Sequence, residues 1–584
     1  MILPGVALGL LALAALRLLP LIAHLVAREA GLARRLAGWR LQREPLQHAR
    51  VALILSFALA LSVFTSTYLA TDQRNAVDRA RYAAGSDVRA SFGFGTGPSV
   101  LDGAIAAAPG VVASSLVFRD SGRPGKSDVS ATVLGVDPYS LQRVAWWRDD
   151  LAGQPLPQLM GELLRGDPDG ASIPGRPQAL SLWVFSTGLD ASLEADLEAA
   201  DGSPIHASFG SLSFRGWNTL EAPLSRLAVQ DFPLRLRTLV MKSTGPNTTG
   251  EIDLSELRAG PPGGSAPMVE AFSAAGGWWQ EMVGQFGGVA PLRLGSRPRN
   301  GEASTGLMVD LTGGGTLALH PAPSSAALPG LVSTQTAAKL GVGVGQSLPL
   351  HIETHDVTVR LVGTVDYFPT LYPGQDDFLV IPAKSLLERL RRLNSYVYPN
   401  EAWMRVGGSP DAAGIAVQNA THGQAQVNDR ETLEASALRS PLRLSLDAAL
   451  IIGLVAALSI VVIGFGLHFL AVARSRVSES AIMQANGLPW RIVNEGLLTE
   501  QVVVLVHSLI VGAALGALMA WAILPVLQSS VLPADLIPPT IVTLDVRTLL
   551  GATLAVLAAA GIMGQLAMRS ASAFRLNDEL RALA

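Results

Sequence analysis

The sequence 448-AALIIGLVAALSIVVIGFGLHFLAV-472 contains no Asp, Glu, Lys or Arg, and neither does 501-QVVVLVHSLIVGAALGALMAWAILPVLQ-528. At about 1.5 Å per helical residue, each run is long enough to cross a hydrocarbon core roughly 30 Å thick. The segment between them begins 473-ARSRVSESAIMQANGLPWR-491 and mixes charged, polar and apolar residues. The pattern predicts two membrane spans joined by a compact amphipathic helix.

The composition also favours a membrane protein. Only 16% of the residues are charged, the net charge is −3 and the mean hydropathy is +0.35, which does not suit a nucleic-acid-binding protein. The absence of cysteine excludes disulfides and cysteine metal sites. A length of 584 residues indicates several domains, and abundant Ala, Gly, Arg and Pro with little Lys is typical of a GC-rich bacterial genome.

Arginines set the predicted topology. Residues 28–50 contain six arginines and only two acidic residues, which is typical of a basic elbow helix on the cytoplasmic leaflet. This placement puts residues 72–443 outside the bacterial cell membrane, with the segment 473–498 and the tail 569–584 inside. The short loop 529–547 is then outside and carries acidic residues. The predicted spans are 1–27, 51–71, 446–472, 501–528 and 549–568.

The large external part divides into two kinds of sequence. Residues 72–160 and 266–440 mix strand-like and helix-like patterns and predict one α/β domain. Residues 178–260 contain short alternating runs separated by turn signals, which predicts a β-sandwich inserted in that domain. The Gly- and Pro-rich stretches 161–176 and 261–265 are interpreted as linkers. The predicted fold class is therefore a five-span helical membrane protein whose external α/β domain is interrupted by a sandwich.

The order of strands in the sandwich resembles galactose-binding-like jelly-roll modules. The resemblance rests on Leu182-Trp183-Val184-Phe185, Gly216-Trp217, 233–236 and 250–254. It implies a glycan-binding surface, for which the candidate glycan or partner contacts are Trp217, Trp278 and Trp279. For Trp183 and Trp217, which stand on alternating strand positions, burial in the sandwich core is the competing interpretation.

The chain contains no convincing catalytic or cofactor motif. Gly125-Lys126-Ser127 ends like a phosphate-binding loop, but position 120 is Asp where such a loop needs Gly. His351, Glu353 and His355 share one face of an extended segment, and a hairpin edge explains them without a metal. Neither Asp149/Asp150 nor Asp376/Asp377 has a nucleophile or base pattern beside it. We expect no enzymatic activity, no metal and no bound cofactor in this chain.

The segment between the two long runs resembles the FtsX-like permease family of ABC transporters, the MacB and lipoprotein-release type. The residues that carry the resemblance are Ala473-Arg474-Ser475-Arg476, Glu479, Ala481-Ile482-Met483, Ala485-x-Gly487 and Leu497-Leu498-x-Glu500. Residues 362–365, 368–370 and 135–138 also resemble the periplasmic domain of larger members.

The resemblance implies a permease subunit that moves its external domain with energy from a separate ATPase. That movement would export or extract a lipid-linked or amphipathic substrate, or regulate a cell-envelope partner. The implied ATPase-coupling residues are Arg474, Arg476, Glu479, Ile482, Met483, Gly487, Trp490 and Arg491. The implied partners are two copies of an ATPase holding ATP and Mg, a second permease half or a second copy of this chain, membrane lipids, and an envelope glycan or protein.

Two features depart from the family. Its permeases have four spans or two four-span repeats, where five are predicted here, and the sandwich is missing from the simpler members. The alternative function is a membrane-anchored surface protein that binds glycans without transport. In the run 501–528, Gly512 and Gly516 form a small-residue step that suits close helix packing, either within the chain or between two copies.

Overall fold

The computed structural model describes residues 22, 24, 27, 31–43, 45–93, 95–125, 129–261, 266–274, 276–283, 290–295, 297–299, 301, 303–312, 314–475, 477–531, 537–547, 550–551, 553–554, 557–558 and 561–562. The chain forms two compact units. One unit contains residues 1–79 and 435–584, and the other contains residues 80–434.

The first unit is helical, and three of its described helices are long and apolar enough to cross a membrane. The three apolar stretches are His48–Ala84, Pro441–His468 and Trp490–Leu524. They contain most of the predicted spans 51–71, 446–472 and 501–528. The predicted spans 1–27 and 549–568 lie mostly outside the described residues, so five spans remain a prediction. The helices that supply this unit are α3 (Leu32–Arg43), α4 (Pro45–Ala84), α11 (Arg430–Leu438), α12 (Pro441–Ser475), α13 (Val477–Ala485) and α14 (Trp490–Val531).

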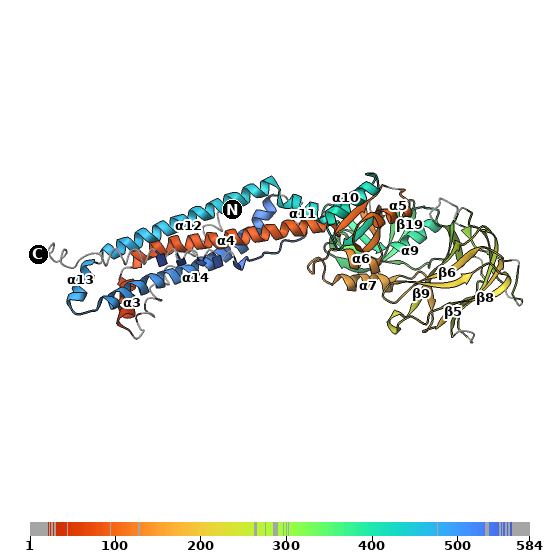
Figure 1. Cartoon of the computed structure of the whole chain (residues 1–584), viewed down its shortest axis with the longest axis horizontal. Coiled ribbons are helices and arrows are strands. Elements are labelled where there is room, and N and C mark those ends of the chain that lie inside the picture. Colours follow the sequence, from red (N-terminus) through yellow and green to blue (C-terminus); the bar gives the residue numbers. More distant parts are fainter. Residues whose placement is uncertain are drawn as a thin grey trace. The chain divides into compact units, whose positions relative to one another are not determined.

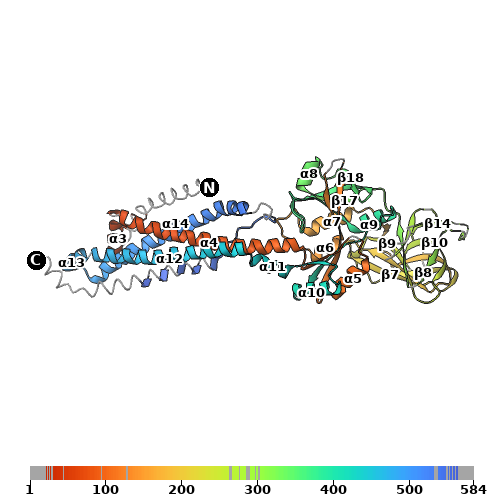
Figure 2. The ribbon, with the colours of Figure 1, turned by 90° about the horizontal axis from the view of Figure 1, so that it is seen from above.

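Helices α4, α12 and α14 run side by side, as both ribbon views show (Figures 1 and 2). Their shared apolar contact is made by Leu55 and Ala58 of α4, Val461 and Phe465 of α12, and Leu505 of α14. Much of α12 faces away from the other helices, and its apolar side chains Ile452, Ile463 and Leu467 are exposed. Helix propensity and apolar character therefore determine the elements, and packing of one face of each determines the bundle.

The second unit contains a nine-stranded mixed sheet. Its strand order is β18-β19-β17-β20-β3-β2-β21-β1-β22, with parallel pairs β17–β19 and β20–β3. The strands are β1 (Val88–Ser91), β2 (Val111–Pro124), β3 (Ala131–Val136), β17 (Leu328–Ser333), β18 (Ser347–Ile352), β19 (His355–Val365), β20 (Asp377–Pro382), β21 (Glu401–Val406) and β22 (Gln426–Asp429). Six helices accompany them: α5 (Pro98–Ala107), α6 (Pro138–Val144), α7 (Leu156–Gly166), α8 (Thr334–Leu340), α9 (Ala383–Arg392) and α10 (Pro410–Ala420).

The remaining strands of this unit form two further sheets that pack face to face. One sheet has the order β14-β15-β10-β5-β8 with β11 beside β10, and the other has β13-β12-β16-β9-β6-β7 with β4 beside β9. Their bounds are β4 (Ala171–Ile173), β5 (Ala179–Thr187), β6 (Ala191–Glu198), β7 (Pro204–Ser211), β8 (Arg215–Pro223), β9 (Leu234–Ser243), β10 (Thr249–Gly260), β11 (Met268–Glu270), β12 (Trp278–Met282), β13 (Ala290–Pro291), β14 (Arg293–Leu294), β15 (Thr305–Asp310) and β16 (Thr316–Pro321).

The predicted boundaries of the sandwich were wrong. Residue 260 does not end it, because β15 pairs with β10 and β16 pairs with β9, and both complete the sheets. On β15, Leu307 and Val309 point into the sandwich core. The predicted linker 161–176 is also wrong, since it holds the end of α7 and the strand β4, which pairs with β9. Gly and Pro there mark tight connections between elements.

Candidate functional site

Helix α13 is a separate short helix that connects α12 to α14. Its end is defined by hydrogen bonds, in which the N–H of Gly487 donates to the carbonyl of Gln484 (2.9 Å) and the N–H of Leu488 to that of Met483 (3.1 Å). Gly487 has φ +89°, a left-handed conformation that glycine adopts without the cost of a side chain. Pro489 follows and precedes α14. The sequence Gly487-Leu488-Pro489 therefore separates α13 from α14.

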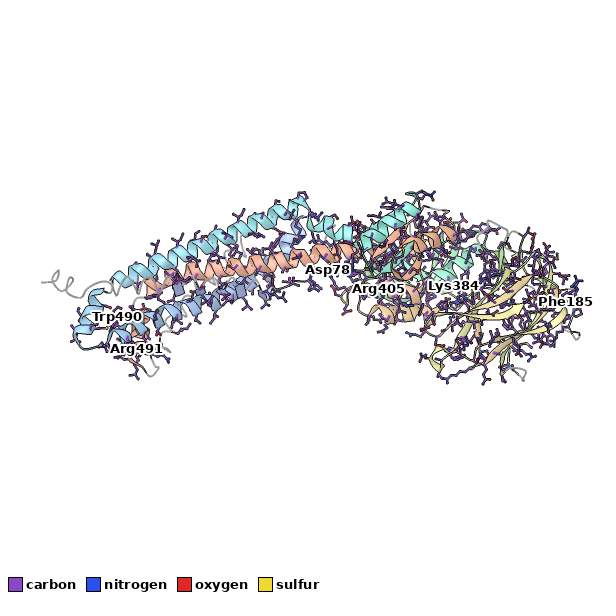
Figure 3. All side chains as sticks on the ribbon, viewed as in Figure 1. Asp78, Phe185, Lys384, Arg405, Trp490 and Arg491 are labelled. Carbon is purple, nitrogen blue, oxygen red and sulfur yellow. The ribbon has the colours of Figure 1, made fainter. Side chains whose placement is uncertain are left out.

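The exposed surface of α13 and of the start of α14 combines apolar and charged groups. The side chain of Ile482 is 61% exposed and that of Trp490 is 37% exposed, which leaves two large apolar groups on the surface. Arg491 is also exposed and pairs with Glu495 at 3.1 Å; Figure 3 labels Trp490 and Arg491 at the start of α14. Of the predicted coupling residues, Arg476 and the side chain of Arg474 lie outside what the structure describes.

A contact that the sequence did not predict ties α13 to the elbow helix α3. The Arg40 guanidinium donates to the Glu479 carboxylate at 3.2 Å and lies 3.9 Å from the sulfur of Met483. Two predicted coupling residues are thus engaged within the chain, although Glu479 is still 60% exposed. No local pattern could have revealed this pairing, because Arg40 and Glu479 are 439 positions apart.

Gly512 and Gly516 lie where α14 approaches α4 most closely. A Cβ at position 512 would be 2.7 Å from the Ser56 carbonyl oxygen, and one at 516 would be 2.5 Å from the Val63 Cβ. These distances leave no room for a methyl group, so α14 uses both glycines to pack against α4 of the same chain.

The predicted aromatic contacts of the sandwich require correction. Trp278 and Trp279 are only 3% and 2% exposed, so neither is an exposed contact. Neighbouring residues of a strand face opposite sides, so Trp278 enters the sandwich core beside Phe272, while Trp279 stacks on His320 at 4.4 Å. Trp217 is half-buried, with its ring 5.9 Å from that of Phe185.

The competing core interpretation for Trp183 and Trp217 is also wrong. Leu182 and Val184 are fully buried inside the sandwich, so the intervening Trp183 lies on the outer face of β5. There the Arg299 guanidinium lies 3.7 Å from the centre of the Trp183 ring, and that of Arg297 lies 4.2 Å from the Phe185 ring. Arginine side chains therefore stack on part of this aromatic face.

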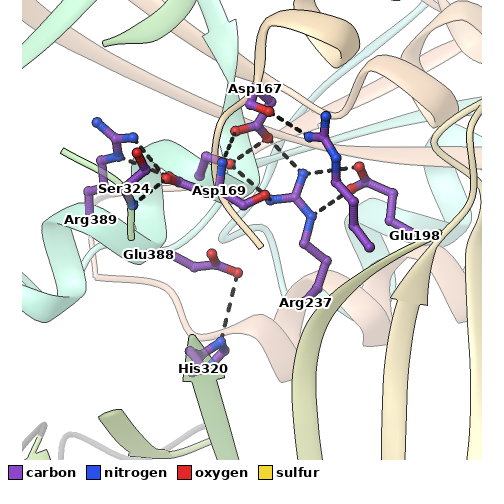
Figure 4. Close-up of polar contacts among 10 residues, drawn as sticks. Asp167, Asp169, Glu198, Arg237, His320, Ser324, Glu388 and Arg389 are labelled. Carbon is purple, nitrogen blue, oxygen red and sulfur yellow. Dashed lines mark hydrogen bonds and ion pairs between the residues drawn. The ribbon is translucent and has the colours of Figure 1, made fainter. Parts of the chain in front are cut away.

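A buried charge network joins the sandwich to the α/β domain (Figure 4). Arg237 on β9 pairs with Asp167 after α7 (2.7 Å) and with Glu198 on β6 (2.9 Å), and the Arg237 side chain is 1% exposed. Burial alone would lower the pKa of Arg237, but the two carboxylates outweigh it and raise that pKa above its ordinary value. Asp169, two residues after Asp167, pairs with Arg389 of α9. These residues fix the sandwich to its host domain.

The hairpin residues considered as a metal set lie beside a small polar pocket. His351 and Glu353, with Asp120 and Arg123, line a pocket of about 320 Å³. His351 pairs with Asp356 at 2.9 Å, as expected of a hairpin edge. Burial, with a smaller effect from Asp120, raises the pKa of Glu353. Among the residues that the structure describes, no group of three His, Cys, Asp or Glu side chains could hold a metal ion.

No protein-family model matches this chain, and a search of curated proteins found no match.

Proposed function

We propose that this protein is the permease subunit of an ABC-type transporter, in which α13 docks with a separate ATPase subunit. The observation that carries the proposal is a short, independently capped helix between two long apolar helices, with Ile482 and Trp490 presented to solvent. A short helix with exposed apolar anchors and a charged rim suits a groove on a partner protein.

The energy in this proposal comes from the partner. The ATPase subunits, expected in two copies, hold ATP and Mg, and their closure on ATP displaces α13. Helices α12 and α14 connect directly to α13, so they receive that displacement. Coupling of this kind requires only that the partner binds the two positions of α13 with different affinity. The chain needs no catalytic group of its own.

The second unit does the external work. We place residues 72–443 outside a bacterial cell membrane, from the arginine distribution of the sequence. Movement of this unit exports or extracts a lipid-linked or amphipathic substrate, or regulates a cell-envelope partner. The permease works with a second permease half or a second copy of this chain.

Copurification tests the docking step. The full chain is co-expressed with each ABC ATPase subunit encoded in the same genome, and both recovery of a complex and its ATP hydrolysis are measured in lipid nanodiscs. Ile482→Asp places a charge on the exposed apolar anchor and is expected to abolish recovery, whereas Ile482→Val keeps an apolar surface and is expected to retain it. The proposal fails if no ATPase copurifies, or if both variants behave like the parent protein.

The alternative of a glycan-binding surface protein rests on one observation. The outer face of β5 and β8 carries Trp183, Phe185 and Trp217 as partly exposed aromatic side chains, which suit stacking on sugar rings. A glycan array probed with the full chain in nanodiscs tests it. Binding that Trp217→Ala removes supports this function, and an array without signal rejects it.

A further inference from the structure

Three titratable side chains from three different helices meet inside the first unit. His48 of α4 and Glu500 of α14 are both fully buried, and the distance from His48 Nε2 to Glu500 Oε1 is 2.7 Å. The ring of His468 from α12 meets the His48 ring edge to face, with 5.9 Å between the ring centres. Residues 48, 468 and 500 are distant in sequence, so only the tertiary structure assembles this cluster.

Such a cluster is costly in its surroundings. His48 begins the apolar stretch of α4, His468 ends that of α12, and Glu500 lies within that of α14. Leu41, Ala52 and Val504 form a small apolar cluster on α3, α4 and α14. Removing a carboxylate and an imidazole from water costs several kcal/mol unless they pair, and an apolar pair of the same volume often packs at least as well. The pair therefore calls for an explanation other than stability.

The pair also has an imperfect geometry. His48 Nε2 lies 2.7 Å from the Glu500 carboxylate, yet neither ring nitrogen of His48 is aligned with a hydrogen-bond acceptor among the described residues. Attraction between the groups depends less on angle than a hydrogen bond does. The attraction thus holds α4 and α14 together without requiring one exact orientation of the two groups.

Its place along the chain points to a role. His468 lies about two turns before α12 ends at Ser475, and Glu500 lies about three turns after α14 begins at Trp490. Both helices that flank α13 are therefore held at the same residue of α4, close to the point where each joins α13. A rigid attachment there limits the positions that α13 can take.

We propose that His48, His468 and Glu500 form a polar clamp that fixes α12 and α14 to α4 and thereby positions α13. The three are positioning residues, because they act on α13 through the helices that carry it. The consequence for partner docking rests on the function proposed above. The mechanical role of the clamp in the isolated chain does not.

Hydrogen exchange of the purified full chain in nanodiscs, with no partner present, tests the clamp. Glu500→Gln removes the charge but keeps the shape, and it is expected to speed amide exchange in residues 477–488 by about tenfold through more frequent local opening. Ser508→Ala is the matched control on the same helix. Ser508 is also buried, and its hydroxyl donates to the Val504 carbonyl of its own helix (2.7 Å). It should leave exchange in 477–488 unchanged.

Two further variants separate the clamp from general destabilisation. The reversed pair H48E/E500H should restore most of the lost protection. His48→Gln removes the other partner of the pair, so the double variant H48Q/E500Q should be no worse than the worse of the two single variants, because each of them already removes the interaction. If Glu500→Gln does not yield a folded protein, Glu500→Asp replaces it: this variant keeps the charge but withdraws it from His48 by one methylene group, and it is expected to speed exchange in the same residues.

The clamp is rejected if Glu500→Gln leaves exchange in 477–488 unchanged, if Ser508→Ala raises it equally, or if the single effects multiply in the double variant. Because no ATPase takes part, failure of an ATPase to copurify leaves this result standing. Conversely, if an ATPase copurifies with the chain but Glu500→Gln leaves the exchange unchanged, the clamp is rejected and the transporter proposal stands.

Discussion

The Arg40 guanidinium lies 3.2 Å from the Glu479 carboxylate and 3.9 Å from the sulfur of Met483, so the elbow helix α3 contacts α13 through these two side chains. The side chain of Arg40 is 15% exposed and that of Glu479 is 60% exposed. Ile482, which is 61% exposed, stays available to a partner.

We expect Arg40→Gln to loosen α13 only modestly. A pair with one exposed member contributes about 0.2–1 kcal/mol, which corresponds to an increase of about 1.4- to fivefold in amide exchange across residues 477–488. The reversed pair R40E/E479R should restore the parent rate. Arg491→Gln is the control, since Arg491 is 87% exposed and pairs with Glu495 of its own helix. Equal effects of Arg40→Gln and Arg491→Gln would contradict the contact.

We expect Gly516→Leu to separate α14 from α4. Its side chain would start 2.5 Å from the Val63 Cβ and 2.6 Å from the Ala60 carbonyl oxygen, and relief of such overlap costs about 1–3 kcal/mol. Thermal unfolding of the chain in detergent, monitored by size-exclusion chromatography, should show a midpoint temperature about 5 °C lower than that of the parent protein.

Gly464→Leu is the matched control for that substitution, because a Cβ at Gly464 of α12 has no described atom within 4 Å beyond its own turn of the helix. It should leave the midpoint unchanged. An unchanged midpoint for Gly516→Leu as well would show that α14 does not pack on α4 as described.

We expect Arg237→Met to loosen the sandwich from the α/β domain. It leaves Asp167 and Glu198 buried without their cation, and breaking a buried pair costs about 3–5 kcal/mol. Limited proteolysis of the full chain should become faster at residues 167–177. The control Lys242→Gln removes an exposed pair on the same strand, with Glu194, and should have little effect. Similar digestion of both variants would rule out a special role for the buried network.

Acid should destabilise the second unit through Glu401. Burial alone would raise the pKa of this carboxyl, but Arg119, at 2.7 Å, and Arg89 outweigh it and lower that pKa below its ordinary value. A carboxylate with a lowered folded-state pKa stabilises the fold above its unfolded pKa of about 4.3, and the stabilisation disappears as the pH falls through the folded value.

The measurement is urea unfolding of the full chain, monitored by tryptophan fluorescence, since the Trp403 N–H donates to Glu401 at 2.8 Å. The parent protein should lose stability steadily below about pH 4.3. Glu401→Gln should be less stable at pH 7 and should vary less with pH in the acid range. If Glu401→Gln loses stability in acid as much as the parent protein does, Glu401 is not the source of the acid sensitivity.

Much of the architecture could be predicted from sequence because its signals are local. Uncharged runs revealed the apolar helices α12 and α14, and alternation revealed β5, β18 and β19. Ser333 caps α8 through a bond to the N–H of Thr336, and Gly341 ends it with φ +65°, so the bounds of that helix follow from neighbouring residues. The extent of the sandwich was missed because strands near residues 305–321 resemble those of any sheet, and only pairing assigns them.

The sequence by itself therefore determined which segments are apolar helices, where strands such as β5, β18 and β19 lie, and where a short helix separates two long ones, because each depends on residues within a few positions of one another. The tertiary structure alone decided which side of the sandwich Trp183 and Trp278 face, since one step along a strand reverses a side chain. It also decided that Arg40 meets Glu479 and that His48 meets Glu500. Those pairs depend on the packing of helices hundreds of residues apart, and no local pattern encodes that packing.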